Sequence, residues 1–219
     1  MTKDQVRQQI LDVGVVPVIR ASSPQKAIAA AEAVLAGGIS VVEITMTVPR
    51  AKEAIVELSK NPELIVGAGT VLNAEAARQC FDAGAQFLVS PGFDLGTVKL
   101  ANSEGYVIMA GALTPTEVIA AWNAGSDFIK IFPCSAVGGA SYIKALKGPL
   151  PQIPMIPTGG VNLKTAADFL AAGAAALGVG GELILSSALE SNNTSAITDL
   201  AKQYVAIIKE IHGKKLAPV

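Results

Sequence analysis

The sequence predicts a (β/α)8 barrel, an α/β fold in which eight parallel strands are enclosed by helices. Ala-rich helical stretches that end at glycine alternate with short apolar runs along the 219 residues. These runs are apolar on both faces, which is typical of a parallel sheet covered by helices. Eight such units fit the lower size limit of a barrel. A doubly wound open sheet is less favoured, because no GxGxxG motif follows the first strand.

The repeat predicts the elements in order. Strands are expected at 15–20, 39–45, 64–68, 86–90, 106–109, 127–131, 154–157 and 175–179. Helices are expected at about 24–36, 50–60, 74–83, 94–103, 115–124, 140–147, 163–172 and 195–211, with an extra N-terminal helix over about 3–13. Glycine ends most of the helices, and a hydroxyl followed by proline starts two of them, at Ser23-Pro24 and Thr114-Pro115. No linker divides the chain, so residues 1–219 are expected to form one domain with a loose tail over 212–219.

Composition limits the class of function. Hydrophobic residues make up 51% of the chain and its net charge is −1, so no surface for nucleic acid or for an anionic membrane is expected. No apolar run reaches the roughly 18 residues of a membrane span, and the polar start of the chain is unlike a signal peptide. Two cysteines give no disulfide framework, and with one histidine a metal site is not expected. The composition is typical of a cytoplasmic protein, and no cofactor is expected.

One strand carries a lysine where lysine is rare. The run from Ser126 to Pro133 is apolar, and alternation places Phe128, Lys130 and Phe132 on one of its faces. Burying a charged ammonium group is costly, and a buried lysine in its neutral form is a nucleophile toward carbonyl groups. Lys130 is therefore the candidate nucleophile. The alternative is an edge-strand lysine that extends to solvent.

A second strand carries a carboxylate in an equally apolar setting. Alternation in the run 39–45 places Glu43 and Thr45 on one face. If that face points inward, Glu43 and Lys130 share the mouth of the barrel, and Glu43 would move protons beside an amine nucleophile. The alternative is a buried ion pair with a structural role.

Other polar and small residues fall at the C-terminal ends of the expected strands, where barrel enzymes carry their active sites. The polar ones among them are Arg20, Thr47, Thr70, Ser90 and Thr158. Gly159-Gly160 and Gly180-Gly181 follow the seventh and eighth strands. That corner of a barrel commonly binds phosphate through backbone N–H groups, which predicts a phosphorylated substrate.

Seven stretches of the sequence carry a family resemblance. They are Val16-Pro17-Val18-Ile19-Arg20, Val42-Glu43-Ile44-Thr45-Met46-Thr47-Val48-Pro49, Val66-Gly67-Ala68-Gly69-Thr70-Val71, Phe87-Leu88-Val89-Ser90-Pro91-Gly92, Leu113-Thr114-Pro115-Thr116-Glu117, Ile129-Lys130-Ile131-Phe132-Pro133 and Pro157-Thr158-Gly159-Gly160-Val161. With them, the chain from about 14 to about 185 resembles the class I 2-keto-3-deoxy-6-phosphogluconate (KDPG) and 2-keto-4-hydroxyglutarate (KHG) aldolases.

The resemblance implies a Schiff-base aldolase of the Entner–Doudoroff pathway that assembles as a homotrimer and acts on a small 2-keto acid. Lys130 would form the imine and Glu43 would be the acid–base residue. The residues implied for the pyruvate pocket are Thr70, Pro91 and Phe132, and those implied near the phosphate are Thr158, Gly159, Gly160, Gly180 and Gly181.

Two positions differ from one branch of that family. Thr47 stands where some members carry an arginine, and we count it among the substrate-binding residues. Arg20 ends the first strand, as in other members, and would supply the guanidinium for the substrate's carboxylate or phosphate. Glu182 stands where some members have a serine that can face phosphate, and a carboxylate there repels phosphate unless it points away.

The expected reaction is the reversible cleavage of KDPG to pyruvate and glyceraldehyde 3-phosphate, with cleavage of KHG to pyruvate and glyoxylate as a second reaction. Three alternatives are open. Decarboxylation of oxaloacetate would use the same lysine imine. A non-catalytic barrel that binds phosphorylated metabolites would need neither Lys130 nor Glu43 on the inward face. A phosphate barrel similar to thiamine phosphate synthase lacks support, because no acidic cluster for Mg²⁺ occurs at the strand ends.

Overall fold

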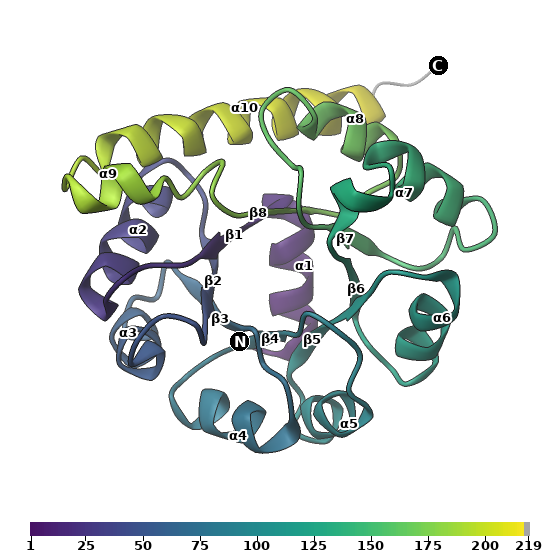
Figure 1. Ribbon diagram of the computed structural model, residues 1–219, viewed down its shortest axis with the longest axis horizontal. Coiled ribbons are helices and arrows are strands. Elements are labelled where there is room, and N and C mark those ends of the chain that lie inside the picture. Colours follow the sequence, from purple (N-terminus) through teal and green to yellow (C-terminus); the bar gives the residue numbers. More distant parts are fainter. Residues whose placement is uncertain (217–219) are drawn as a thin grey trace.

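The chain folds into a barrel of eight parallel strands surrounded by helices, which confirms the fold class predicted from the sequence (Figure 1). The computed structural model describes residues 1–216. The strands are β1 (Val15–Ile19), β2 (Val41–Thr45), β3 (Ile65–Gly69), β4 (Phe87–Val89), β5 (Val107–Ala112), β6 (Phe128–Ile131), β7 (Met155–Pro157) and β8 (Leu177–Val179). Consecutive strands pair from β1 to β7, and β8 pairs with β1. A parallel bridge between Thr158 and Gly178 completes the ring.

The helices form an outer layer around the barrel. They are α1 (Lys3–Val13), α2 (Pro24–Ala36), α3 (Ala51–Leu58), α4 (Ala74–Asp82), α5 (Leu95–Ser103), α6 (Pro115–Asn123), the 3-10 helix η1 (Cys134–Val137), α7 (Ala140–Lys147), α8 (Ala166–Ala171), α9 (Ser186–Glu190) and α10 (Ser195–Leu216). The long helix α10 lies along α2 and α8 on one side of the barrel (Figure 1). Within the described residues, no helix is long and apolar enough to cross a membrane.

Several elements differ in their ends from the prediction. Helix α8 begins at residue 166 rather than 163, because the Asn162 side chain accepts hydrogen bonds from the backbone N–H groups of Lys164 and Thr165 and holds a turn there. Helix α10 continues to residue 216, whereas a loose tail was expected from residue 212. Gly213 costs a helix only about 1 kcal/mol relative to alanine, and the sequence has no proline between residues 195 and 217. Residues 217–219 of the expected tail lie outside the described part of the chain.

Two short helices, η1 and α9, were not expected. They contain 4 and 5 residues, too few to leave a helical period in the sequence. Strand β5 ends three residues later than predicted, at residue 112. Its extension includes Gly111, which packs against the backbone of Pro91. Both unexpected helices follow strands at their C-terminal ends, beside the mouth of the barrel.

Buried apolar side chains form two clusters, one on each side of the barrel wall. The smaller cluster fills the interior and includes Phe87, Met109 and Phe128 from the strands, with Val6 and Ile10 from α1. The larger cluster packs the outward faces of the strands against the helices. Both faces of each strand are therefore covered, which explains why the strands read as continuous apolar runs in the sequence.

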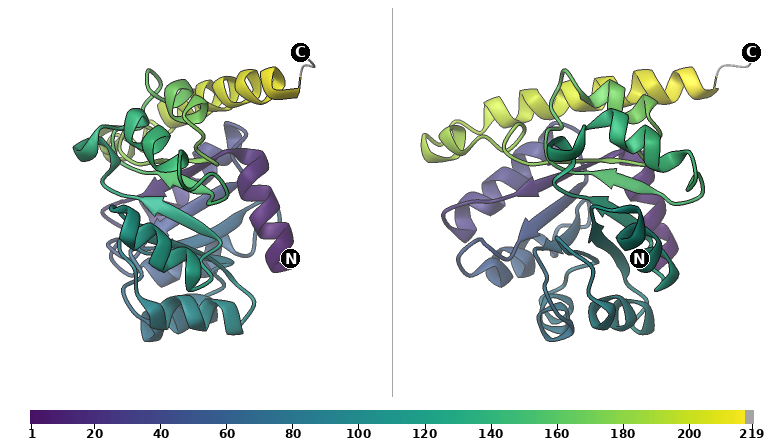
Figure 2. Two further views of the ribbon diagram at one scale, coloured as in Figure 1. Left: turned by 90° about the vertical axis from the view of Figure 1, so that its right-hand side faces the viewer. Right: turned by 45° about the vertical axis from the view of Figure 1, so that its right-hand side comes forward.

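Helix α1 lies across the N-terminal end of the barrel (Figure 2). Gly14 ends the helix in a left-handed conformation, with φ 69°, one residue before β1 begins. The guanidinium carbon of Arg7 lies 5.6 Å from the centroid of the Phe128 ring, within the range of a cation–π contact. With Val6 and Ile10 in the interior cluster, α1 acts as the floor of the barrel.

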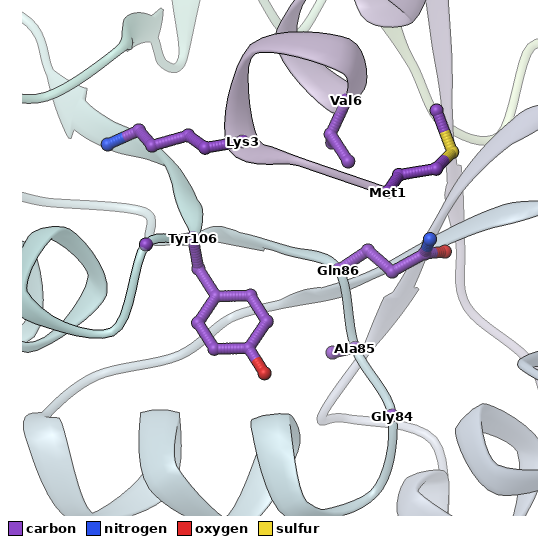
Figure 3. Close-up of a pocket in the computed structure, with 8 residues that line it drawn as sticks. Met1, Lys3, Val6, Gly84, Ala85, Gln86 and Tyr106 are labelled. Atoms are coloured by element: carbon purple, nitrogen blue, oxygen red, sulfur yellow. The ribbon is translucent and has the colours of Figure 1, made fainter.

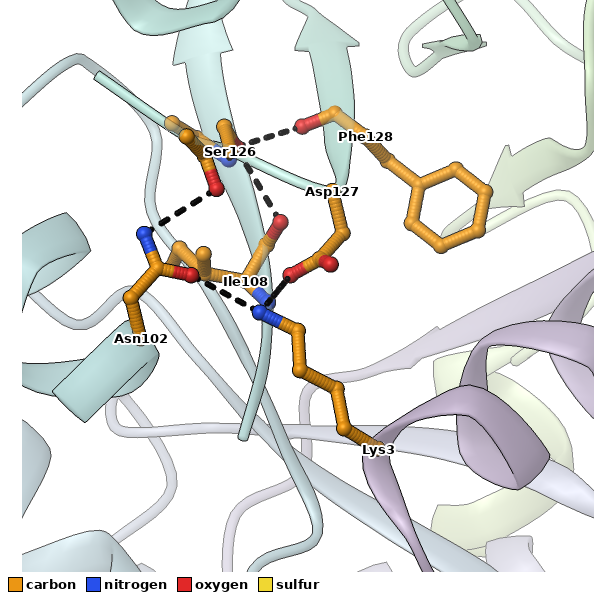
Figure 4. A network of polar contacts seen from close by, with 8 residues as sticks. Lys3, Asn102, Ile108, Ser126, Asp127 and Phe128 are labelled. Atoms are coloured by element: carbon orange, nitrogen blue, oxygen red, sulfur yellow. Dashed lines mark hydrogen bonds and ion pairs between the residues drawn. The ribbon is translucent and has the colours of Figure 1, made fainter. Parts of the chain in front are cut away.

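A polar network ties this floor to β6, the strand that carries Lys130 (Figure 4). Lys3 Nζ lies 3.0 Å from Asp127 Oδ2 and donates a hydrogen bond of 2.7 Å to Asn102 Oδ1. Asp127 Oδ2 also accepts a hydrogen bond from the backbone N–H of Ile108, at 2.9 Å. The start of β6 is thus fixed both to β5 and to α1.

A hollow opens beside α1 at the same end of the barrel (Figure 3). Met1, Lys3 and Val6 line it on one side, and Gln86 and Tyr106, which precede β4 and β5, line it on the other. The hollow lies at the N-terminal ends of the strands, where a barrel is built for stability. It is therefore separate from the strand ends at which the sequence placed the functional residues.

Gly67 leaves room for a large side chain in the interior. A Cβ atom at this position would lie 2.2 Å from the ring of Phe87, which is fully buried. We expect Gly67→Ala to lower the free energy of unfolding by about 1–3 kcal/mol, because the ring has no free space to move into. Urea denaturation followed by circular dichroism measures this. Gly92→Ala is the matched control, since nothing lies within 4 Å of a Cβ atom there. Equal unfolding midpoints for the two variants would contradict the packing argument.

Candidate active site

Lys130 lies in the middle of β6 and is almost completely enclosed. Its side chain is 6% exposed, which removes the alternative of an edge lysine that extends to solvent. In the sheet it stands opposite Gly111 of β5 and Ile156 of β7. Gly111 has no side chain, and the backbone of Pro91, in the loop after β4, packs against it. The absence of a side chain at Gly111 therefore lets the loop after β4 approach the strand next to Lys130.

Glu43 faces Lys130 from β2. Its side chain is 3% exposed, and its Oε1 atom lies 3.7 Å from Lys130 Nζ. The carboxylate occupies the position that a side chain of Gly69 would take, because a Cβ atom on that glycine would lie 1.9 Å from Glu43 Oε1. The two charged residues predicted to share the barrel interior are therefore brought together, across the barrel, by strands distant in the sequence.

The pair is buried but not hydrogen-bonded. A distance of 3.7 Å is too long for a hydrogen bond between nitrogen and oxygen, and Glu43 Oε1 has no hydrogen-bond partner in the described structure. Burying two charges is costly, and a pair that serves only stability recovers the cost best through direct hydrogen bonds. A buried carboxylate oxygen without a hydrogen-bond partner is instead suited to accept a hydrogen bond from a substrate or a water molecule.

Three further residues predicted for the pyruvate pocket follow the strands around Lys130. The ring centroid of Phe132 lies 5.5 Å from Lys130 Nζ. Pro91 contacts Gly111, the residue paired with Lys130 in the sheet. Thr70 follows β3 in a left-handed conformation, with φ 60°, which is uncommon for a threonine and is favoured at functional sites.

The residues predicted for the phosphate end lie beside β7, β8 and β1. Thr158 is buried, and its Oγ1 atom would be 2.1 Å from a Cβ atom on Gly178 of β8. Gly159 and Gly160 adopt φ angles of 92° and 77°, which exposes the backbone in a conformation that other residues rarely take. Arg20 is exposed at the end of β1.

The turn after β8 lies next to Arg20, at the same corner of the barrel. A Cβ atom on Gly180 would lie 3.4 Å from Arg20 Nη1, whereas one on Gly181 would meet nothing within 4 Å. Thr47 is exposed in the loop after β2 and lines a hollow together with Arg20. The structure thus places a guanidinium group beside glycine-rich turns at this corner of the mouth.

Glu182 extends toward the outer helices. Its exposed side chain lines a hollow with Leu185 and Leu200, the latter on α10. Burial raises the pKa of Tyr204, also on α10, and the Glu182 carboxylate raises it further. The Glu182 charge therefore acts on the helix layer, as is needed if it is to avoid repelling a phosphate group.

Other candidate nucleophiles and ligands fit less well. Cys134 directly follows the Lys130 strand, but burial raises the pKa of its thiol to about 11, so the thiolate is scarce at neutral pH. Lys147, on α7, donates hydrogen bonds to the carbonyl groups of Pro151 and Ile153. Across residues 1–216, no group of three or more His, Cys, Asp or Glu side chains is arranged to hold a metal ion.

Sequence reasoning missed residues whose role is to be small or to orient others. Gly69 makes room for the Glu43 carboxylate, Gly111 makes room for the backbone of Pro91, and Thr45 bonds to the end of β1. Glycine within a strand is a signal of close approach by another group. What it cannot indicate is which group approaches, since the partner comes from another strand.

Comparison with known proteins shows the family of the chain. A family model described as KDPG and KHG aldolase matches residues 6–200. The chain is 39% identical over 202 residues to a 2-dehydro-3-deoxy-phosphogluconate aldolase of Dickeya dadantii, covering 91% of this chain and 94% of the relative. It is 37% identical to the KHG/KDPG aldolase of Escherichia coli K12, covering 90% and 94%. The chain belongs to this family.

A solved structure shows the same relation in three dimensions. The KDPG aldolase of Legionella pneumophila, captured with pyruvate as a covalent carbinolamine intermediate, superposes with a TM-score of 0.84 at 32% identity. The match covers 90% of this chain and 97% of that one. The expectations of the family, of a class I aldolase and of a carbon–carbon lyase are thereby confirmed.

The contact between Gly69 and Glu43 yields a prediction. A methyl group at Gly69 would displace the carboxylate, so we expect Gly69→Ala to lower kcat for aldol cleavage about 100-fold, the order of loss that a 1 Å misplacement can cause. Steady-state kinetics with KDPG, alongside circular dichroism to verify folding, measures this. Gly92→Ala, at an open position of the mouth, should retain wild-type turnover. A Gly69→Ala enzyme that is folded and fully active would contradict the assigned position of Glu43.

Proposed function

We propose that the chain cleaves KDPG reversibly to pyruvate and glyceraldehyde 3-phosphate through an imine on Lys130, and that it also cleaves KHG to pyruvate and glyoxylate. The observation that carries this proposal is the buried pair of Lys130 Nζ and Glu43 Oε1, which lie 3.7 Å apart and in which Glu43 Oε1 has no hydrogen-bond partner. The names of the aldolases to which the chain is similar support the two substrates.

The first half of the reaction makes the imine. Lys130, as the neutral amine, attacks the C2 ketone of the substrate and gives a carbinolamine. Glu43 delivers a proton to the departing hydroxyl group, water leaves, and a protonated imine remains. The carbinolamine captured in the Legionella relative supports this order of steps.

The second half breaks the carbon–carbon bond. Glu43, as the carboxylate, removes the proton of the C4 hydroxyl, the C3–C4 bond breaks, and its electron pair moves into the imine to give an enamine. The C4 carbon leaves as the aldehyde. Protonation of the enamine at C3 and attack of water on the imine then release pyruvate and restore Lys130. The unpartnered Oε1 atom of Glu43 fits both proton transfers, because it has no competing hydrogen bond to break.

The remaining residues bind the two ends of the substrate. Thr70, Pro91 and Phe132 surround the pyruvyl part in this proposal. Arg20 and the turns at Gly159-Gly160 and Gly180-Gly181 hold the phosphate, since a guanidinium and exposed backbone N–H groups are suitable donors for an anion. Thr158 lies between the proposed sites for the pyruvyl part and for the phosphate, and its side chain packs on Gly178.

Borohydride trapping tests the nucleophile. With pyruvate and sodium borohydride, we expect a stable pyruvyl adduct on Lys130, located by peptide mass spectrometry after digestion. Lys130→Met should give no adduct. Lys147→Met is the matched control, because burial lowers the pKa of Lys147 and makes it the competing amine most open to modification. An adduct that disappears in Lys147→Met but persists in Lys130→Met would overturn the assignment.

A homotrimer and a cytoplasmic location belong to the same proposal. Exposed apolar side chains between β3 and α4 and around the start of α5 support self-association: Leu72 is 62% exposed, Phe93 37% and Leu95 45%. The first turns of α4 and α5 are adjacent, since a Cβ atom on Gly96 would lie 3.8 Å from Ala74 Cβ. The two cysteines of the chain are free, which suits a reducing compartment.

The assembly has a direct test. In sedimentation equilibrium we expect three times the chain mass of 22.3 kDa. Leu72→Glu combined with Phe93→Glu should shift the protein toward monomer, because two charges would be buried in the contact. Val56→Glu, at an apolar position of α3 that is 45% exposed, should leave the mass unchanged. A monomeric wild-type protein would rule out the trimer.

A further inference from the structure

Two threonines form a chain of hydrogen bonds beside the proposed site. Thr45 is fully buried at the end of β2, on the same face as Glu43. Its Oγ1 atom donates a hydrogen bond of 2.9 Å to the carbonyl oxygen of Ile19, the last residue of β1. The same Oγ1 atom lies 2.7 Å from Thr47 Oγ1 in the loop that follows β2. The chain of contacts runs from a backbone carbonyl group to an exposed hydroxyl group.

The direction of the protons in this chain is determined. A hydroxyl group has one proton to donate, and the Thr45 proton is used on the Ile19 carbonyl oxygen, which can only accept. The bond between the two threonines must therefore use the proton of Thr47. What Thr47 then offers to a ligand is a lone pair of its oxygen, so it acts as a hydrogen-bond acceptor.

Thr47 lies next to Arg20, which binds the anionic end of the substrate in the proposed function. It lines a hollow with Arg20, between the loops after β1 and β2 and helix α9. Glu190, also at this hollow, is already engaged by Ser22 and Lys26. An acceptor next to Arg20 disfavours the oxygen of a carboxylate or phosphate and favours a group that can donate, such as a hydroxyl.

We propose that Thr47 is a specificity-determining residue that accepts a hydrogen bond from the substrate hydroxyl next to the aldehyde carbon. The proposal rests on the proposed function, in which Glu43 handles the oxygen that becomes the aldehyde and Arg20 binds the anionic end. The hydroxyl between those two groups is the donor that remains. Thr45 is a positioning residue, since it holds the Thr47 hydroxyl in the accepting orientation. The site would then select polyhydroxy substrates such as KDPG over KHG, whose aldehyde product has no such hydroxyl.

A pair of aldehydes tests the proposal in the direction of aldol addition to pyruvate. Glyceraldehyde 3-phosphate and 3-oxopropyl phosphate carry the same phosphate and differ only in the hydroxyl next to the aldehyde carbon. The quantity to measure is the ratio of their kcat/KM values. In Thr47→Val we expect this ratio to fall about two- to tenfold, the discrimination that one hydrogen bond supplies. Thr47→Ser should keep the wild-type ratio.

Thr45 gives an independent readout of the same proposal. In Thr45→Val the Thr47 hydroxyl is free to rotate, so the ratio should fall although Thr47 is still present. Thr45→Ser should restore it, because serine retains the hydroxyl. If Thr45→Val does not fold, the exposed position of Thr47 keeps the first pair of variants decisive.

The outcomes separate this inference from the proposed function. A wild-type ratio in Thr47→Val overturns the role of Thr47. An equal loss of activity toward both aldehydes in Thr45→Val overturns the positioning role of Thr45 and leaves it a purely structural residue. Failure of the proposed function shows elsewhere, as the absence both of a pyruvate adduct on Lys130 and of aldol addition to either aldehyde in the wild-type enzyme, and that outcome also overturns the role of Thr47.

Discussion

The separation between Lys130 and Glu43 is the constraint on which the rest of the site depends. Two charged side chains that are each less than one-tenth exposed lie 3.7 Å apart, close enough to interact and too far apart to hydrogen-bond. Direct contact would satisfy both groups and leave neither for a substrate, whereas a wider separation would leave two buried charges without compensation. The barrel holds them at the intermediate distance because they project from β2 and β6, whose separation is set by the strands between them.

The barrel wall makes room for this pair by omitting side chains. Gly69 leaves space for the Glu43 carboxylate, and Gly111, opposite Lys130 in the sheet, leaves space for the backbone of Pro91. On the far side, Gly178 leaves space for the Thr158 hydroxyl. Glycine inside a strand weakens it, so these positions lower the stability of the barrel at the C-terminal ends of its strands. The apolar interior cluster and the α1 floor with its Lys3–Asp127 ion pair lie at the other end, where they stabilise the strands without restricting the mouth.

The charged residues of the site and the residues that make room for them differ in how well the sequence predicts them. The eight strands, the helices between them and the residues Lys130 and Glu43 could be predicted, because a charge in an apolar alternating run is unusual and is visible within one segment. The helices η1 and α9 could not, since each is too short to show a period. Nor could the contact between Gly69 and Glu43, which depends on the register of two separate strands. The sequence therefore identifies the candidate reacting residues more easily than it identifies the residues that hold them in place.

The same limit applies to the recognition of the substrate's distal end. Thr47 could be named from its place in a motif, yet its chemical character follows from Thr45, two residues earlier, and from the carbonyl oxygen of Ile19 on another strand. A threonine in isolation both donates and accepts hydrogen bonds, and only the surrounding bonds decide which role remains available. Arg20 directly follows Ile19, so the bond that orients Thr47 also fixes the strand end from which the guanidinium extends. In our proposal, binding of the anion and recognition of the hydroxyl are in this way coupled through the buried side chain of Thr45.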